Sequence, residues 1–263
     1  MPRRRVHVLE LSSGRLVLGK SEAHHVRDVL RMKVDEELEL FNDAGAQASA
    51  RITRCDAGTV EVEVGEMQFS KNRTELIVAS AIPKGERADW MIEKLSELGV
   101  TRFIPLIAAR SVVVPSGKNK LDRWRRIATE SAKQSKRAGV MAIDDPREMG
   151  NALAGSVGWA LPTSSHEGGQ CPPYTNRQAA LFYLSTEPSA PSIFSATTRD
   201  VFREIVLFIG PEGGWTEEEI TLFARHNLTP ARLTATILRV ETAAVAAAAI
   251  AATFISQKEP ESP

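Results

Sequence analysis

Residues 205–220 contain an apolar run that stops abruptly at a glycine-rich turn, with three glutamates close behind it. The run Ile205–Ile209 is rich in β-branched residues, as a buried parallel strand would be. The turn reads Gly-Pro-Glu-Gly-Gly, and Thr216 followed by Glu217–Glu219 is typical of a helix start. We therefore predict a strand, a turn and a helix of an open α/β sheet. In such sheets this turn lies at the carboxyl edge of the strands, where ligands usually bind.

Other parts of the chain after residue 73 repeat this alternation. Apolar strands are predicted at Leu76–Ala81, Phe103–Ile107 and Ala180–Leu184, with helical stretches at 86–99 and 121–137 between them. This order is typical of a parallel sheet with helices on its faces. The second helix leaves a set of basic side chains outside, namely Arg123, Arg126, Lys133 and Arg137. They indicate either a solvated face or RNA contact, and both readings stay open.

The first 72 residues have a different pattern of apolar residues. Short alternating apolar runs occur at 37–41, 50–53 and 60–64, with turns between them. Such runs predict a small β-barrel or sandwich. The apolar spacing within 21–31 predicts one short helix inside it. We place a domain boundary at about residue 72.

Composition narrows the class of protein. With 263 residues, 43% of them hydrophobic and 25% charged, the chain is typical of a globular protein. Residues 155–177 are rich in Gly, Ser, Pro and Thr and are expected to form a loop, and the tail after Gln257 is expected to fray. The formal net charge is zero, so a nucleic-acid partner would need a local basic patch.

Two classes of protein are disfavoured. No apolar run approaches the roughly 20 residues of a membrane helix, and the N-terminal MPRRRVHVLE lacks the apolar region of a secretory signal. We expect a cytoplasmic protein with no membrane partner. Cys55 and Cys171 stand apart, without the spacing of a zinc site or a disulfide framework. We therefore expect no metal and reduced thiols.

The glycine-rich turn has two interpretations. Gly210, Gly213 and Gly214 permit positive φ and close backbone approach, so amide groups of the turn could meet a phosphate or carboxylate. Alternatively, the glycines only allow a helix and a sheet to pack closely. Neither of the two common nucleotide-binding glycine patterns is present.

A second motif lies downstream and reads ILRVETAAVAAAA over residues 237–249. Its alanines allow another helix or backbone to approach closely. Together with GPEGGWTEEEI, it resembles the RsmE family of SPOUT-class ribosomal RNA methyltransferases. Further segments similar to the family are Pro83–Gly85, Glu93–Val100, Arg110–Val113, Glu130–Arg137 and His24–Met32. The resemblance covers most of the chain in order, and departures from the family pattern occur at Met141, Thr234, Thr236 and Val240.

The resemblance implies domains and a cofactor. Residues 1–72 would form a PUA-like, RNA-binding β-barrel, residues 73–258 a SPOUT α/β domain with a deep trefoil knot, and residues 259–263 a frayed tail. Family members bind S-adenosylmethionine among three loops. The cofactor-binding residues implied here are Leu184, Ser185, Thr186, Ile209, Gly210, Pro211, Glu212, Gly213, Gly214, Leu233, Ile237, Leu238, Arg239 and Thr242.

The resemblance also implies a reaction, the methylation of the N3 atom of one uridine in small-subunit (16S) ribosomal RNA. The protein must align the displacement and assist loss of the N3 proton, which needs no covalent nucleophile. Glu241 is the candidate proton acceptor, and Arg239 the candidate for stabilising charge on the uracil oxygens or holding phosphate. A structural ion pair is the alternative for each residue. Other open functions are methylation of a ribose hydroxyl or of another RNA, and ribosome-assembly RNA binding without catalysis.

Basic and polar side chains are the candidate RNA contacts, because arginine suits phosphate and unpaired bases. The candidates are Arg3, Arg4, Arg5, His24, His25, Arg27, Arg31, Lys84, Arg110, Gln134 and Arg137. A basic terminus can also serve solubility alone.

The last expectation is a homodimer formed through the knotted domain. The alanine-rich helix from Thr242 to Ala252, with Phe254 and Ile255, offers more small and apolar surface than covering a sheet requires. A helix buried within its own domain is equally consistent with this composition. The resemblance favours the dimer, because related enzymes pair two knots.

Overall fold

The computed structural model describes residues 4–69, 74–114, 117–137, 139–158, 179–197 and 202–258. The chain divides into two compact units, one of Met1–Asn72 with Arg126–Ala142 and the other of Arg73–Arg125 with Ile143–Pro263. Residues 126–142 thus group with the first unit, whereas the sequence analysis assigned them to the second domain. Gly139 gives a local reason: it has φ of 95° and lies against Asp43 and Gly45, so that a Cβ would sit 3.2 Å from the Asp43 carbonyl oxygen.

The first unit is built on one six-stranded sheet, in the order β1-β3-β4-β5-β2 with β6 beside β4. Its strands are β1 (Arg4–His7), β2 (Gly14–Val17), β3 (Glu37–Phe41), β4 (Ala46–Cys55), β5 (Val60–Val64) and β6 (Gln68–Phe69). Strands β1 and β3 run parallel, and the other pairs run antiparallel. All six described strands share one sheet, which favours the predicted barrel over a sandwich of two sheets.

The core of this unit follows the predicted alternation. On β4, Ala46, Ala48, Ala50 and Ile52 point inward while the residues between them do not. The expected short helix is also confirmed: α1 (Lys20–His24) continues directly into a π-helical turn, η1 (His25–Val29). Val26 on this turn is fully buried and joins the sheet core. Val26 thereby anchors this helical segment to the core of the first unit, and the polar residues of the segment lie on its other sides.

The second unit is a parallel sheet in the order β10-β8-β7-β12-β11-β13, with a seventh strand, β9, beside β8. Its strands are β7 (Glu75–Ser80), β8 (Arg102–Ile107), β9 (Ala142–Ile143), β10 (Arg147–Glu148), β11 (Ala179–Leu184), β12 (Glu204–Ile209) and β13 (Thr229–Ala231). All pairs along the main path are parallel. The four strands predicted from sequence are confirmed, and so is the parallel arrangement.

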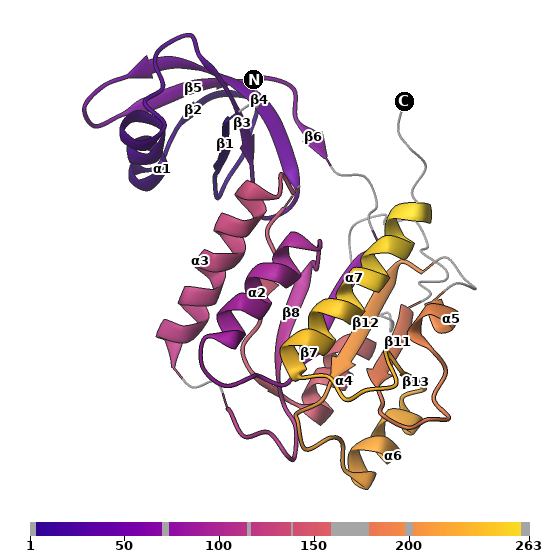
Figure 1. Cartoon of the computed structure of the whole chain (residues 1–263). Coiled ribbons are helices and arrows are strands. Elements are labelled where there is room, and N and C mark those ends of the chain that lie inside the picture. Colours follow the sequence, from indigo (N-terminus) through magenta and orange to yellow (C-terminus); the bar gives the residue numbers. More distant parts are fainter. Residues whose placement is uncertain are drawn as a thin grey trace, which may run out of the picture. The chain divides into compact units, whose positions relative to one another are not determined.

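Helices cover both faces of this sheet (Figure 1). The helices of the second unit are α2 (Arg87–Glu97), α4 (Met149–Gly158), α5 (Ile193–Thr197), α6 (Glu217–Arg225) and α7 (Val240–Lys258), together with the first half of α3 (Lys118–Gln134). Helix α7 lies over β7 and β12 and packs against α2. On the opposite face, Phe223 of α6 and Leu153 of α4 share a core with Phe208 of β12. The prediction of helices on the faces of a parallel sheet is therefore confirmed.

Two local expectations turn out differently, and a third lies outside the described residues. The loop predicted to begin at residue 155 starts later, because α4 runs to Gly158, and residues 159–177 lie outside the described part of the chain. The tail beyond Lys258 lies outside it as well. Arg123, expected to be free, forms a 2.6 Å ion pair with Asp89, whose other oxygen accepts a hydrogen bond from the Trp124 indole. Gly99 has φ of 89° and occupies the left-handed position that commonly ends a helix.

Candidate functional site

The carboxyl ends of β11, β12 and β13 meet at one edge of the sheet. Strand β11 pairs in parallel with β12 on one side and β13 on the other, so Leu184, Ile209 and Ala231 end neighbouring strands. The three segments predicted from sequence to bind a cofactor follow these ends. The structure thus brings them to one edge, where open α/β sheets usually bind ligands.

Two hydrogen bonds tie the start of these segments together. The Trp215 indole Nε1 donates to the Leu184 carbonyl oxygen at 2.8 Å, which links the glycine-rich turn to the end of β11. The Ser185 amide donates to the Ala231 carbonyl oxygen at 2.9 Å, which links the segment after β11 to β13. Phe223 packs against the edge of the Trp215 ring, with 4.9 Å between centroids and 86° between planes. The carboxyl edge of the sheet is therefore stabilised by these two hydrogen bonds and by the aromatic contact between Trp215 and Phe223.

The glycines of the turn have specific structural reasons. A Cβ on Gly210 would lie 2.9 Å from Cε2 of Trp215, and a Cβ on Gly213 would lie 3.2 Å from Cβ of Arg110. Gly214 has φ of 70° and closes the turn, since its amide donates to the Pro211 carbonyl oxygen at 2.8 Å. Close packing against protein side chains therefore explains Gly210 and Gly213 without any ligand. The sequence analysis left this interpretation open.

The acidic run after the turn is explained by Glu219. Its Oε2 accepts from the Thr216 amide at 2.8 Å, and the Thr216 hydroxyl accepts from the Glu219 amide at 3.3 Å, which forms a capping box. The Glu219 Oε1 also accepts from the Ala109 amide at 2.9 Å. This buried carboxylate joins the start of α6 to the segment after β8. Thr216 and Glu219 have the capping-box spacing, so the local part of this role could be read from sequence.

Arg110 contacts the same turn. Its Nη1 donates to the carbonyl oxygens of Gly213 at 2.7 Å and Trp215 at 3.3 Å. Arg110 is an RNA candidate from sequence, whereas its observed hydrogen bonds support the glycine-rich turn. Lys84, another RNA candidate of the second unit, is exposed.

The third segment ends in the candidate catalytic residues. Thr234 Oγ1 donates to the Thr236 carbonyl oxygen at 2.7 Å, and the neighbouring Ile237 is 82% exposed. Arg239 is exposed, whereas Glu241, in the first turn of α7, is buried. The structure therefore does not bring these two side chains into a common ion pair. Of the other named cofactor residues, Glu212 and Thr242 are exposed and Pro211 is buried.

Glu241 has a partner that the sequence analysis missed. Its Oε1 lies 3.3 Å from Nη1 of Arg87, at the start of α2. Its Oε2 is buried and has no hydrogen-bond partner among the described residues. Leaving a buried acceptor unpaired costs about 1–3 kcal/mol, and native proteins rarely do so without a reason. No local pattern connects the two residues, which lie 154 positions apart.

The first unit carries most of the remaining RNA candidates, and one of them is corrected. The Arg5 side chain is only 5% exposed, with Nε 2.9 Å from Glu39 Oε1 and the guanidinium 4.4 Å from the Phe41 ring centre. It lies in the sheet and is not open to RNA phosphate, because the acidic and aromatic groups beside it hold it there. Arg4, His24 and Arg31 are exposed, while His25 and Arg137 are half-buried and Gln134 is exposed at the end of α3. Arg3 lies outside the described residues.

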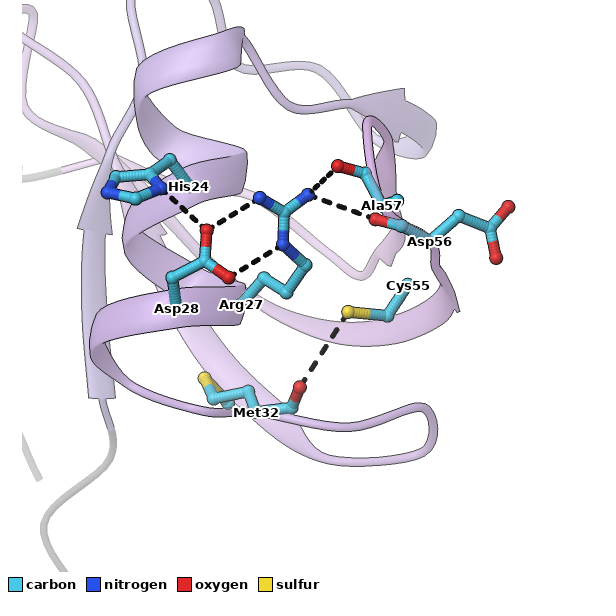
Figure 2. A network of polar contacts seen from close by, with 7 residues as sticks. All are labelled: His24, Arg27, Asp28, Met32, Cys55, Asp56 and Ala57. Carbon is cyan, nitrogen blue, oxygen red and sulfur yellow. Dashed lines mark hydrogen bonds and ion pairs between the residues drawn. The ribbon is translucent and has the colours of Figure 1, made fainter.

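Arg27 is committed to a network of polar contacts, shown in Figure 2. Its Nε and Nη2 donate to the two carboxylate oxygens of Asp28 at 2.9 and 2.6 Å, and its Nη1 donates to the carbonyl oxygens of Asp56 and Ala57. His24 Nδ1 lies 2.6 Å from Asp28 Oδ2. The hydrogen bond from Arg27 lowers the pKa of Asp28 to about 2. Arg27 therefore joins the π-helical turn to the β4–β5 turn. Its Nε, Nη1 and Nη2 all donate within the protein, which leaves few N–H donors for a ligand.

The described residues lack two kinds of feature. No group of three or more His, Cys, Asp or Glu side chains that could hold a metal ion occurs among the residues of known placement. No helix in that part of the chain is long and apolar enough to span a membrane.

Comparison with protein families gives two matches. Residues 70–252 match the RNA methyltransferase domain, and residues 18–65 match the RNA methyltransferase PUA domain. Two relatives named ribosomal RNA small subunit methyltransferase E are each 30% identical to the chain. The match to the Synechocystis protein spans 89% of this chain and 71% of that protein. The match to the Bacillus subtilis protein spans 84% of this chain and 83% of that protein.

Solved structures agree with these matches. The ribosomal RNA small subunit methyltransferase E of Neisseria gonorrhoeae, bound to S-adenosyl methionine, has a TM-score of 0.76 and 27% identity over 95% of this chain and 97% of its own. A Legionella pneumophila structure described as a methyltransferase with the bound cofactor SAM has a TM-score of 0.73 and 26% identity, over 96% and 98%. The α/β fold and the PUA domain inferred from sequence are confirmed. The chain belongs to the ribosomal RNA small subunit methyltransferase E family of RNA methyltransferases.

Proposed function

We propose that this protein transfers a methyl group from S-adenosylmethionine to the N3 atom of one uridine in small-subunit (16S) ribosomal RNA. Membership of the family supports methylation of this RNA, and the relatives crystallised with S-adenosylmethionine support the cofactor. The choice of uridine N3 is what the family resemblance carried by residues 209–214 and 237–242 implies. A ribosomal RNA substrate also supports a cytoplasmic location.

One observation carries the cofactor part of the proposal. The hydrogen bond from Trp215 Nε1 to the Leu184 carbonyl oxygen holds two of the three expected cofactor segments together at the carboxyl edge of the sheet. The third segment follows β13, which pairs with β11. Such an edge is the usual ligand-binding position of an open α/β sheet.

The residues at this edge fit S-adenosylmethionine. Ile237 is 82% exposed and so offers an apolar side chain, which suits the face of a flat ring system. We assign the backbone of the turn 209–214 and the segment 233–239 to cofactor binding.

The chemistry asks the protein for alignment and for a proton acceptor. Bound S-adenosylmethionine supplies an electrophilic methyl group, so that a bond from N3 to carbon forms while the carbon–sulfur bond breaks and its electron pair stays on sulfur. The N3–H proton must leave, and its bonding electrons remain on the nitrogen. We assign the proton to Oε2 of Glu241, a buried acceptor that has no partner within the described part of the chain. Arg239, which is exposed, is assigned to the developing charge on uracil or to RNA phosphate.

Two measurements test this function. Purified protein with methyl-labelled S-adenosylmethionine should label unmodified small-subunit RNA or its assembly particle, and should leave large-subunit RNA unlabelled. Calorimetric titration with S-adenosylmethionine should show binding. If the protein binds RNA but shows no heat of S-adenosylmethionine binding and transfers no label, it is instead a ribosome-assembly RNA binder. Labelled RNA whose mark lies on a ribose hydroxyl would establish the other alternative.

We further propose that exposed basic groups of the first unit bind the RNA. Arg4, Arg31 and the imidazole of His24 are open to solvent on this unit, and phosphate contacts by such groups depend on salt. Reversing the charge of Arg31 should weaken RNA affinity and reduce its salt dependence. Reversing the charge of Arg51, which pairs with Glu37 across the sheet, is the matched control. Equal effects of the two changes would argue against a specific RNA surface.

We also propose a homodimer formed through the second unit, as the motifs imply together with a trefoil knot. Light scattering should give about twice the chain mass of 28.7 kDa. Mixing a cofactor-site variant with an RNA-surface variant should restore part of the activity if one subunit's RNA reaches the other's cofactor. A monomer with full activity would contradict the dimer and leave the methylation proposal intact.

A further inference from the structure

The buried carboxylate of Glu241 is held asymmetrically. Its Oε1 is 3.3 Å from Arg87 Nη1, whereas its Oε2 has no hydrogen-bond partner among the described residues. The Glu241 side chain is 8% exposed and that of Arg87 is 42% exposed, so a partly exposed guanidinium reaches a buried carboxylate. The two carboxylate oxygens therefore differ: Oε1 faces the Arg87 guanidinium, and Oε2 faces no donor from the residues of known placement.

The position of both residues is set by helix packing. Helices α2 and α7 pack together, and the small buried residues Ala244, Ala247 and Ala248 of α7 allow a close approach. Arg87 begins α2 and Glu241 lies in the first turn of α7. The Arg239 carbonyl oxygen accepts from the Ala243 amide at 2.8 Å, which fixes the backbone on either side of Glu241.

We propose that Arg87 is the positioning residue for Glu241. Its guanidinium engages Oε1 and thereby holds the carboxylate in the orientation that leaves Oε2 as the acceptor for the substrate's N–H proton. This inference rests on the proposed function. In the proton transfer the N3–H bond breaks, an O–H bond forms at Oε2, and Arg87 exchanges no atom or electron. Arg87 acts through Glu241 and needs no contact with substrate or cofactor.

Four variants test the proposal in single-turnover assays at saturating S-adenosylmethionine. Arg87→Met should slow methyl transfer by about 100-fold, because misplacement of a reacting group costs about that much, while the KM for RNA and the cofactor affinity stay unchanged. Glu241→Gln should slow it by at least about 100-fold. The double variant should be no slower than Glu241→Gln, since Arg87 acts through Glu241. Lys94→Met is the matched control: it removes one charge from the same helix, from a residue whose partners are Glu93 and Glu97, and should keep the full rate.

Rescue separates positioning from general support of the fold. Arg87→Lys should retain part of the rate, because an ammonium can still pair with Oε1 but lacks the planar fork. Millimolar guanidinium ion should restore part of the rate of Arg87→Met and none of the rate of Glu241→Gln. A double variant whose rate loss is the product of the two single losses, or an Arg87→Met protein with the full rate, would overturn the proposal.

Thermal unfolding without cofactor gives a readout that does not depend on catalysis. The melting temperatures of the two single variants and the double variant should be non-additive, because the two side chains contact each other. Additive changes would show that the pair does not form and would overturn the inference. If the wild-type protein transfers no methyl group to RNA while the unfolding data are non-additive, the proposed function fails and the pair itself stands.

Discussion

The Trp215 indole donates a 2.8 Å hydrogen bond to the carbonyl oxygen of Leu184, and this bond joins the glycine-rich turn after β12 to the end of β11. The same ring lies beneath Gly210 and against Phe223. One side chain thus fixes the spacing of two segments that follow neighbouring strands. We therefore expect the geometry of the cofactor site to depend on this spacing.

Replacing Trp215 by Phe should weaken cofactor binding and lower stability. The change removes the indole donor and leaves the Leu184 carbonyl oxygen without its partner, at a cost of about 1–3 kcal/mol in the free energy of unfolding. The affinity for S-adenosylmethionine, measured by calorimetry, should fall together with the free energy of unfolding. Trp90→Phe is the matched control, because that indole is on the half-exposed face of α2. Indistinguishable cofactor affinities for the two variants would contradict the role of Trp215.

Replacing Gly210 by Ala should distort the turn. The new Cβ would lie 2.9 Å from Cε2 of Trp215, and the ring cannot move without losing its hydrogen bond and its contact with Phe223. Overpacking of this kind costs about 1–3 kcal/mol. Gly150→Ala in α4 has no atom within 4 Å of its new Cβ and should be neutral or stabilising by about 1 kcal/mol. Urea unfolding of both variants checks the difference, and equal stabilities would count against this explanation of the motif.

Replacing Glu219 by Ala should loosen the start of α6. Two amides, those of Thr216 and Ala109, lose their acceptor, and the expected loss in the free energy of unfolding is about 2 kcal/mol. Glu217→Ala removes an exposed glutamate of the same first turn and should cost about 0.3–1 kcal/mol through the helix dipole. Denaturant titration of the pair measures both values. A Glu219 variant as stable as the Glu217 variant would show that the carboxylate does not join the two segments.

The sequence predicted more of the architecture than of the site. Strands such as β4 and β12 are encoded by their own apolar pattern, and the helix beginning at Thr216 by local capping chemistry, so both could be read from short windows. Arg87 and Glu241 are 154 residues apart, and Trp215 and Leu184 are 31 apart. No periodicity connects residues across such distances. Arg5 was misassigned because an exposed arginine and one lying over Phe41 have the same sequence signature.

Acid should release the network around Arg27. The hydrogen bond from Arg27, assisted by one from His24, lowers the pKa of Asp28 from 3.8 to about 2 in the folded protein. A lowered folded pKa stabilises the protein above pH 3.8, and this contribution is lost as the pH falls towards about 2. The stability difference between wild type and Asp28→Asn should therefore be constant at neutral and mildly acidic pH and shrink below 3.8. Urea unfolding across that range measures it, and a difference that persists at pH 2 would show that the carboxylate does not carry the network.

The most direct measurement is the chemical position of the methyl group in RNA treated with the purified protein. Small-subunit RNA from cells that lack the modification is incubated with S-adenosylmethionine, digested and analysed by mass spectrometry, and a second sample is read by reverse transcriptase. We predict one methylated uridine with the added mass on the base and a strong reverse-transcription stop at that nucleotide, because a methyl group on N3 blocks Watson–Crick pairing. A methyl group on a ribose, without such a stop, or no methylated nucleotide at all, would contradict the proposed reaction.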